Sequence, residues 1–322
     1  MIVTVTLNPS LDLTYALAES TLGEIDVHRA ETSSVEASGK GVNVSRTLHM
    51  AGVATVAVLP AGGQTGQHVG DLLAAERVEH VAVPVRGETR INTSLLLATG
   101  QTVKVNGPGT PLARTDLDQL LGTLGTVLTG LDDDGGEDWL ALCGSLPPGL
   151  APDVVGEFVH LAHRHAVRCA VDVSGPPLAA ALRAKADLLA PNRLELGELV
   201  GADVATAEIP AVAEAAGRLA ADSGTELLVS MGSEGALHTD GIQVLHGSGP
   251  ALVPVNTAGA GDAFLAGWLA MPGTPQERMA RALAWGRSAC LSVTTVDRAP
   301  GTRGVDGITV TAINPRLKGT HS

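Results

Sequence analysis

The sequence contains few aromatic residues and few cysteines. Phe, Trp and Tyr together make up 2% of its 322 residues, so the core must be built from Ala, Val and Leu, and nucleic-acid binding by base stacking is disfavoured. The three cysteines, Cys143, Cys169 and Cys290, stand singly in apolar surroundings. This placement disfavours a disulfide framework and a cysteine-ligated metal site.

Positive charge is also scarce. The chain has 21 Lys and Arg against 34 Asp and Glu, a net charge of −13, which disfavours nucleic acid or an anionic membrane as a partner. No apolar run approaches the length of a membrane span, and the N-terminus lacks the basic segment of a signal peptide. We therefore expect a soluble cytoplasmic protein in which any anion is bound by a few cations gathered in a cleft.

Strand-like and helical patterns alternate along the chain. Strands are expected at Ile2–Leu7, Thr55–Leu59, Trp139–Cys143, Val167–Asp172, Leu188–Ala190, Glu226–Ser230, Gly235–Thr239 and Gln243–His246. Helices are expected near Val42–Met50, Thr65–Arg77, Thr115–Leu131, Pro152–Arg164, Pro177–Arg183, Arg193–Val200, Ile209–Ser223, Gly261–Met271 and Gln276–Val293. The alternation predicts an α/β fold with a mostly parallel central sheet, whose ligands bind beyond the carboxyl ends of the strands.

Two stretches interrupt this alternation. Residues 12–35 are strand-like, and residues 89–105 have the pattern of a hairpin. Both could pair into a small second sheet, and ordinary surface hairpins are the alternative. We expect one domain over residues 1–322, with lid segments at about 12–35 and 86–106. The acidic run 132–138 is expected to be a solvated connection, and the tail after Gly307 to be partly disordered.

The segment Val255-Asn-Thr-Ala-Gly-Ala-Gly-Asp-Ala-Phe264 is the most informative in the chain. An expected strand, Ala251–Val255, precedes Gly259, Ala260 and Gly261, and Asp262 then opens an apolar helical run. Glycines let a polyanion approach the backbone, and the free N–H groups of a first helical turn favour negative charge. The pattern indicates an anion hole with a carboxylate at its rim, as phosphoryl transfer needs. Simple helix capping by the acidic residue explains the same residues.

Four segments in order resemble the PfkB, or ribokinase-like, carbohydrate kinases. Residues 259–262 resemble the Gly-Ala-Gly-Asp signature, and residues 37–46 resemble the second family signature. Residues 6–12 and 143–149 resemble the branch that contains 1-phosphofructokinase and tagatose-6-phosphate kinase. The resemblance implies a ribokinase-like three-layer sandwich with a small β-sheet lid. In that family the lid covers the sugar and often forms a dimer interface, so a homodimer through the lid is one expected assembly.

A sugar-phosphate site is expected near the lid. Lys40 and Asn43 follow small residues at a helix start, which suits a polyhydroxylated ligand, and a glycine turn with a solvent-facing Lys is the alternative. Arg90 and Lys104 converge on one phosphate if the hairpin arms pair antiparallel, although composition alone favours solvated charges. The resemblance implies the substrate-binding set Asp12, Gly39, Lys40, Asn43, Arg90, Lys104 and Ser145. Ser38 and Gly107 stand where relatives usually have Gly and an acidic residue.

A nucleotide site is implied further along the chain. Asn192 and Glu195 have the spacing of a helix capping box, and the glycines between Ser230 and Gly235 suit a hairpin turn. The resemblance nevertheless implies an ATP-binding set of Asn192, Glu195, Ser230, Gly232, Gly235 and Gly261. It places Mg²⁺ with ATP, held through water near Glu195 and without a direct protein ligand. The sequence has neither a P-loop nor a Gly-x-Gly-x-x-Gly pattern.

The resemblance implies a kinase that uses ATP and Mg²⁺ and phosphorylates a hydroxyl of a ketohexose phosphate. Fructose 1-phosphate is the first choice, tagatose 6-phosphate is the alternative, and fructose 6-phosphate or an unphosphorylated sugar ranks below them. Asp262 would be the base, with the N–H groups of Gly259, Ala260 and Gly261 stabilising the transferred group. Lys40, Arg90 and Lys104 would hold the sugar's phosphate. A non-catalytic sugar-phosphate sensor would not need Asp262, and a nicotinamide oxidoreductase would need the missing glycine pattern.

Overall fold

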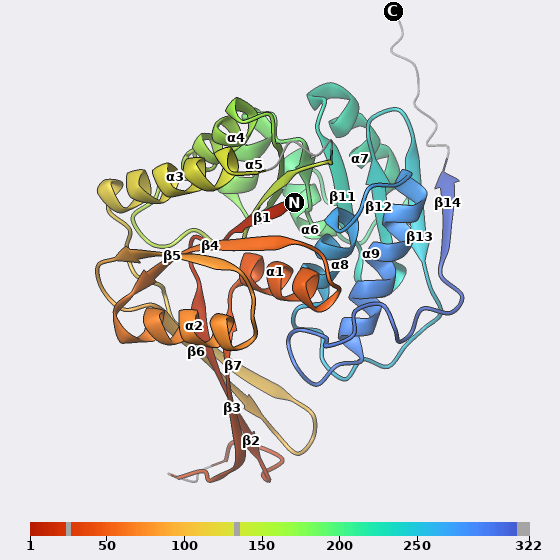
Figure 1. The fold of residues 1–322 in the computed structure, drawn as a ribbon. Coiled ribbons are helices and arrows are strands. Elements are labelled where there is room, and N and C mark those ends of the chain that lie inside the picture. The colour runs from red at the N-terminus through yellow and green to blue at the C-terminus, as the bar shows by residue number, and fades with distance from the viewer. Residues whose placement is uncertain (24–26, 132–135, 314–322) are drawn as a thin grey trace, which may run out of the picture.

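The computed structural model describes residues 1–23, 27–131 and 136–313, and their strands form two sheets (Figure 1). The larger sheet has the order β14-β13-β12-β11-β10-β9-β8-β1-β4-β5. Pairing is parallel from β5 to β11 and antiparallel from β11 to β14. Its strands are β1 (Ile2–Val5), β4 (Thr55–Gly62), β5 (His80–Val85), β8 (Trp139–Cys143), β9 (Arg168–Asp172), β10 (Leu188–Leu189), β11 (Glu226–Ser230), β12 (Ala236–Thr239), β13 (Val244–Ser248) and β14 (Thr309–Ile313).

Helices cover both faces of this sheet, as the alternating pattern predicts. One face packs against α3 (Arg114–Thr129), α4 (Val154–Arg164), α5 (Pro176–Arg183), α6 (Arg193–Val200) and α7 (Ile209–Ser223). The other packs against α1 (Lys40–Met50), α2 (Gly63–Ala75), α8 (Ala260–Leu269) and α9 (Pro275–Cys290). The two layers and the sheet between them form the expected three-layer sandwich. No helix in the described ranges is long and apolar enough to cross a membrane.

The smaller sheet projects from the body of the molecule (Figure 1). Its order is β3-β2-β6-β7, with β2 (Ser10–Leu17), β3 (Ala30–Ser38), β6 (Arg90–Leu96) and β7 (Thr102–Asn106). β2 pairs antiparallel with β3 and parallel with β6, and β6 pairs antiparallel with β7. The two interrupting stretches therefore form a second sheet, as predicted, and we call this four-stranded sheet the lid.

Three segments differ from the sequence predictions. Residues 251–255 form no strand; Val253 and Val255 are exposed there, and the Val255 N–H donates to the carbonyl of Cys290. The prediction overlooked β5. Among the described strands β5 pairs with β4 alone, and this edge position tolerates its Pro84. The prediction also overlooked β14, which adds to the far edge although the tail was expected to be partly disordered. Residues 132–135 and 314–322 lie outside the described part.

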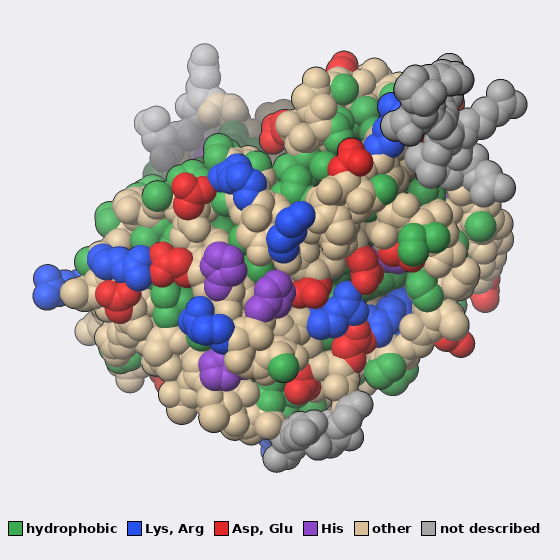
Figure 2. All heavy atoms as spheres, turned by 90° about the horizontal axis from the view of Figure 1, so that it is seen from above, with side chains coloured by type: hydrophobic (Ala, Val, Ile, Leu, Met, Phe, Trp, Pro, Cys, Tyr) green, Lys and Arg blue, Asp and Glu red, His purple; other side chains and the backbone are tan. Residues whose placement is uncertain are grey.

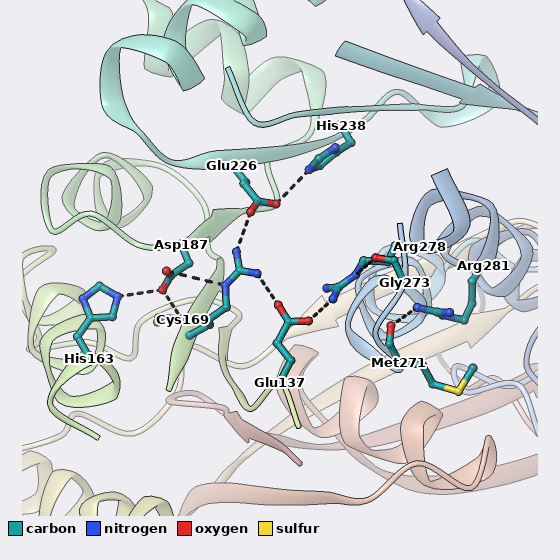
Figure 3. A network of polar contacts seen from close by, with 11 residues as sticks. Glu137, His163, Cys169, Asp187, Glu226, His238, Met271, Gly273, Arg278 and Arg281 are labelled. Atoms are coloured by element: carbon teal, nitrogen blue, oxygen red, sulfur yellow. Dashed lines mark hydrogen bonds and ion pairs between the residues drawn. The ribbon is translucent and has the colours of Figure 1, made fainter. Parts of the chain in front are cut away.

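A network of charged side chains closes the sheet at the amino ends of its strands (Figure 3). The Arg168 guanidinium contacts Glu137 and Glu226, and it lies 4.2 Å from the centre of the Trp139 ring. Glu137 also pairs with Arg278 of α9. Seen from above, at the end away from the lid, Lys and Arg side chains interleave with Asp and Glu (Figure 2). Side chains of both signs are thus mixed at this end of the molecule.

Candidate active site

A cavity of about 720 Å³ lies between the lid and the carboxyl ends of the central strands. Lys40, Asn43, Asp172, Asn192, Glu195 and Asp262 line it from the body, and Asp12, Glu36, Arg90, Asn92 and Lys104 line it from the lid. Ligands of open α/β sheets bind at this edge. The cavity therefore collects most of the predicted site residues from segments that are far apart in the sequence.

Asp262 stands in the first turn of α8, at the floor of the cavity. Gly259 caps this helix with φ 78°, and a Cβ at Gly259 would lie 2.1 Å from the carbonyl oxygen of Thr295, so only glycine fits there. Apart from its chain neighbours and the backbone of its own helix, a Cβ at Gly261 would meet no atom of the described residues within 4 Å, and Gly261 lines the cavity. The first turn of α8 therefore presents backbone with open space in front of it, as the anion-hole interpretation requires.

The Asp262 carboxylate is buried and held in one orientation. Asp262 is only 7% exposed, and its Oδ2 accepts a hydrogen bond of 2.8 Å from Nδ2 of Asn43. Burial, together with the charge of Asp172, raises the pKa of Asp262 to about 7, against the opposing effects of Asn43 and Lys40. A carboxyl group with a pKa near neutrality suits a general base.

Asp172 is a site residue that the sequence reasoning missed. It is the last residue of β9, and its Oδ1 accepts a hydrogen bond of 2.8 Å from Nζ of Lys40. Burial lowers the pKa of Lys40, but Asp172 outweighs burial, so the net shift is upward and Lys40 stays charged. The signal that could have identified Asp172 from the sequence is a carboxylate at the carboxyl end of a predicted parallel strand. Lys40 is thus paired with a residue of the body, whereas Arg90 and Lys104, with which the sequence analysis groups it, belong to the lid.

The cavity face of the lid carries the other predicted sugar-site residues. Arg90 and Lys104 both line the cavity, and Arg90 Nη1 donates to the carbonyl of Gly107 at 3.1 Å while its buried Nε has no partner among the described residues. A Cβ at Gly107 would lie 2.8 Å from the carbonyl oxygen of Ile91. Gly107 thus permits the close approach that supports Arg90. Asp12 Oδ1 accepts from Asn92 Nδ2 at 2.9 Å.

The residues predicted for the nucleotide divide into two groups. Asn192, Glu195 and Ser230 line the cavity, and Asn192 and Glu195 also form the predicted capping box, with bonds of 2.9 and 2.8 Å. Glu195 Oε1 accepts from Ser174 as well, so both carboxylate oxygens have protein donors. Gly232 and Gly235 are absent from the cavity lining and belong to the turn between β11 and β12.

Of two further predicted residues, one lines the cavity and the other does not. Gly39 lines it and caps α1 with φ 124°, where a Cβ would meet the side chain of Thr6 at 2.7 Å. Ser145 is exposed outside the lining residues, and its Oγ lies 3.2 Å from Nδ2 of Asn8. Ser38 lines the cavity from the end of β3. Within the described residues, no group of three or more His, Cys, Asp or Glu side chains is arranged to hold a metal ion.

Comparison with known proteins identifies the family. The profile of the pfkB family carbohydrate kinases matches residues 5–297. The chain belongs to this family. It is 34% identical to a 1-phosphofructokinase of Bacillus subtilis, covering 84% of this chain and 85% of the relative. It is 30% identical to a tagatose-6-phosphate kinase of Staphylococcus epidermidis, covering 83% and 84%.

The solved structures agree with this assignment. The phosphofructokinase-2 of Escherichia coli in complex with fructose-6-phosphate matches with a TM-score of 0.82 and 29% identity, covering 92% of this chain and 96% of that one. The predicted fold class and the family resemblance are both confirmed. This pfkB family member is a kinase, a phosphotransferase with a hydroxyl group as acceptor. Sugar kinases of this family use ATP, generally with Mg²⁺.

Proposed function

We propose that this kinase transfers the γ-phosphoryl group of MgATP to a hydroxyl of a ketohexose phosphate, converting fructose 1-phosphate to fructose 1,6-bisphosphate. The observation that carries the proposal is the pair of lid cations, Arg90 and Lys104, which line the same cavity as Asp262. A sugar that already carries a phosphate needs such cations, and a free sugar does not. Named 1-phosphofructokinases among the relatives, from Bacillus subtilis and Rhodobacter capsulatus, support fructose 1-phosphate as the substrate.

Asp262 is the residue that we assign to proton transfer. The Asn43 bond to Oδ2 fixes the carboxylate plane, and Oδ1 takes the proton as the sugar hydroxyl attacks the γ-phosphorus. The N–H groups of Gly259, Ala260 and Gly261 stabilise the charge on the phosphoryl oxygens. Oδ1 of Asn43 is buried without a partner among the described residues, which leaves it free to accept from a second hydroxyl of the sugar.

Lys40 has a different place in this proposal from the one the sequence suggested. It is paired with Asp172, and its charge also acts on Asp262. We therefore assign Lys40 to the end of the cavity where the phosphoryl group is transferred. A cation there offsets negative charge that develops during transfer. Arg90 and Lys104 remain as the cations for the phosphate already present on the sugar.

The body of the cavity suits MgATP as the second substrate. The space in front of Gly261 and the start of α8 accommodates phosphates, and Asn192, Glu195 and Ser230 line the adjoining wall. Both oxygens of Glu195 already accept hydrogen bonds from protein donors. Mg²⁺ bound with the nucleotide commonly keeps several waters. Glu195 would then act on the metal through those waters.

The proposal also includes a homodimer formed through the lid and a location in the cytoplasm. The outer face of the lid exposes Val35, Ile91 and Val105, apolar side chains that a homodimer through the lid would cover. A structure of Escherichia coli phosphofructokinase-2, 30% identical with a TM-score of 0.82, is a tetrameric inhibited form. Three free cysteines fit a reducing cytoplasm. Light scattering of wild type and of Val105→Lys tests the dimer, which the added charge should dissociate.

Turnover assays test the proposed substrate. ADP formation with Mg²⁺ would be measured with fructose 1-phosphate, tagatose 6-phosphate and fructose 6-phosphate, and with free fructose and ribose as controls. We expect the highest kcat/KM with fructose 1-phosphate. A preference for tagatose 6-phosphate would favour the alternative kinase, which the Staphylococcus epidermidis relatives represent. Turnover of free sugars alone would contradict the assignment of the lid cations.

Substitution of Lys104 sharpens this test. Lys104→Met should raise the KM for the sugar phosphate by roughly tenfold or more, the cost of losing one hydrogen bond to a charged group, and leave the KM for ATP unchanged. Lys185→Met is the matched control, because Lys185 is exposed, does not line the cavity and, among the described residues, its side chain has the carbonyl of Ser223 as its one hydrogen-bond partner. Equal effects of the two substitutions would refute a phosphate-binding role for Lys104.

A further inference from the structure

The lid face toward the cavity divides into an anionic half and a cationic half. Alternate residues of all four strands line the cavity. On β3 and β2 the charged residues among them are Glu36 and Asp12, and on β6 and β7 they are Arg90 and Lys104. A sugar phosphate lying on this face is therefore oriented, with its phosphate over β6 and β7 and its hydroxyl groups over β2 and β3.

Glu36 and Asp12 are directly opposite each other in the antiparallel pair formed by β2 and β3. Residues in this relation have Cβ atoms about 4.5–5.5 Å apart, and like charges placed there destabilise a sheet. The anionic pair therefore works against folding of the lid. Two carboxylates at this spacing suit a ligand with donors on neighbouring atoms, such as the adjacent hydroxyl groups of a sugar.

Each carboxylate is fixed through one of its oxygens and keeps the other for a ligand. Asp12 Oδ1 accepts from Ser10 and Asn92 at 2.7 and 2.9 Å, while Oδ2 has no polar contact with the described residues. Glu36 Oε1 lies 3.4 Å from Arg46 Nη2, and Oε2 has no polar contact there either. The Glu36 side chain is 20% exposed, which leaves it open to the cavity.

The arginine that holds Glu36 is itself anchored elsewhere. Arg46 is buried, makes two hydrogen bonds of 2.6 Å to Glu76, and donates to the carbonyl of Ala37 at 3.0 Å. Its position therefore does not depend on Glu36. The Glu36 carboxylate can turn toward a ligand, or be removed, without freeing a buried charge.

We propose that Glu36 is a substrate-binding and specificity-determining residue, whose free oxygen accepts a hydrogen bond from a sugar hydroxyl next to the one that Asp12 binds. This inference rests on the proposed function. Two neighbouring acceptors fix the relative configuration of two adjacent hydroxyl groups. The pair therefore discriminates between ketohexose phosphates that differ in the configuration of a hydroxyl-bearing carbon, as fructose 6-phosphate and tagatose 6-phosphate do.

Kinetics of Glu36→Ala and Glu36→Gln test the proposal. We expect Glu36→Ala to raise the KM for the preferred sugar phosphate about tenfold, as loss of a hydrogen bond to a charged group predicts, and to reduce the discrimination between fructose 6-phosphate and tagatose 6-phosphate. Glu36→Gln retains an acceptor oxygen, so its increase in KM should be smaller. The KM for ATP should stay at the wild-type value, and the melting temperature should not fall, because Arg46 keeps Glu76 and the repulsion between Glu36 and Asp12 is removed.

Glu31→Gln is the matched control, since Glu31 belongs to the same strand, is exposed and does not line the cavity. If wild type is active and Glu36→Ala keeps its sugar KM and its discrimination within about twofold, a range that corresponds to roughly 0.4 kcal/mol, the role of Glu36 is refuted and the proposed function stands. An equal rise in the KM for ATP would show a structural role and also refute it. Wild type without turnover on any sugar phosphate would overturn the proposed function together with this inference.

Discussion

Asp262 is buried, and the role that we propose for it as a base requires it to be deprotonated. Asp262→Asn should lower kcat by roughly 10²–10⁴-fold, the usual contribution of general acid–base catalysis, and leave the KM for the sugar phosphate near wild type. The melting temperature should not fall, since the substitution removes a charge whose burial is unfavourable. Steady-state kinetics and calorimetry check both parts. Turnover close to wild type would refute Asp262 as the base.

The pH dependence of the rate follows from the same residue. Because burial and Asp172 raise the pKa of Asp262 to about 7, the base is protonated below that pH. We expect kcat/KM to fall on the acidic side of about pH 7. Asp172→Asn removes the repelling charge and frees Lys40, and both effects lower the pKa of Asp262, so the acidic limb should move to lower pH. A rate profile that is flat from pH 6 to pH 8, or unmoved in the variant, would contradict this assignment.

At the scale of one element, two glycines at the start of α8, the N-cap Gly259 and Gly261 of the first turn, have different roles. Gly261→Ala meets no atom within 4 Å and improves helix propensity, so it should keep or raise stability while raising the KM for ATP, because the new methyl group enters the cavity. The backbone at Gly259 has φ 78°, and the Cβ of an alanine there would clash with the Thr295 carbonyl. Gly259→Ala should therefore lower the melting temperature. Thermal unfolding and ATP kinetics of the two variants separate these effects. Reduced stability in Gly261→Ala would show that the space is not open.

The elements also show how far sequence reasoning reaches. Strands with continuous apolar runs, such as Trp139–Cys143, were predicted at their observed bounds because buried parallel strands leave a strong pattern. The edge strands β5 and β14 leave a weak pattern, since one contains proline and the other is mostly exposed. Asp262 and Asn43 stood out through local motifs. Asp172 did not, because what marks it as a site residue is its ion pair with Lys40, which is 132 residues away in the chain.

At the scale of the whole molecule, the network at the amino ends of the strands links distant parts of the sequence. Arg168 and Arg278 hold Glu137 from two elements, and Glu226 joins the same group. Glu137→Gln should lower the free energy of unfolding by about 1–3 kcal/mol, because it weakens hydrogen bonds to two charged groups. Glu157→Gln breaks an exposed pair with Arg114 and should cost less than about 1 kcal/mol. Denaturant unfolding compares the two, and equal costs would contradict the importance of the network.

Acid should weaken this network in a defined direction. Burial opposes ionisation of both Glu137 and Glu226. At Glu137 the effect of Arg278 and Arg168 outweighs burial, and the pKa is lowered from 4.5. At Glu226 the effect of His238 and Arg168 outweighs burial, and the pKa is lowered from 4.5 as well. A lowered pKa in the folded state contributes stability above the unfolded value and loses it as the pH falls. Stability should therefore decline below about pH 4.5, and the decline should be shallower in Glu137→Gln. An unchanged slope in that variant would refute this account.

The lid has one consequence for how such a kinase could be changed. Its two cations both lie on the β6–β7 hairpin, residues 90–106, while the transfer chemistry that we assign to Asp262 belongs to the body. Exchanging this hairpin for that of a relative would therefore alter how the phosphate of the acceptor is held, while Asp12 and Glu36 on β2 and β3, and the catalytic residues of the body, stay in place. Recognition of the acceptor's phosphate would then depend on 17 consecutive residues, counted from Arg90 to Asn106. A chain organised in this way can acquire new acceptors through local changes.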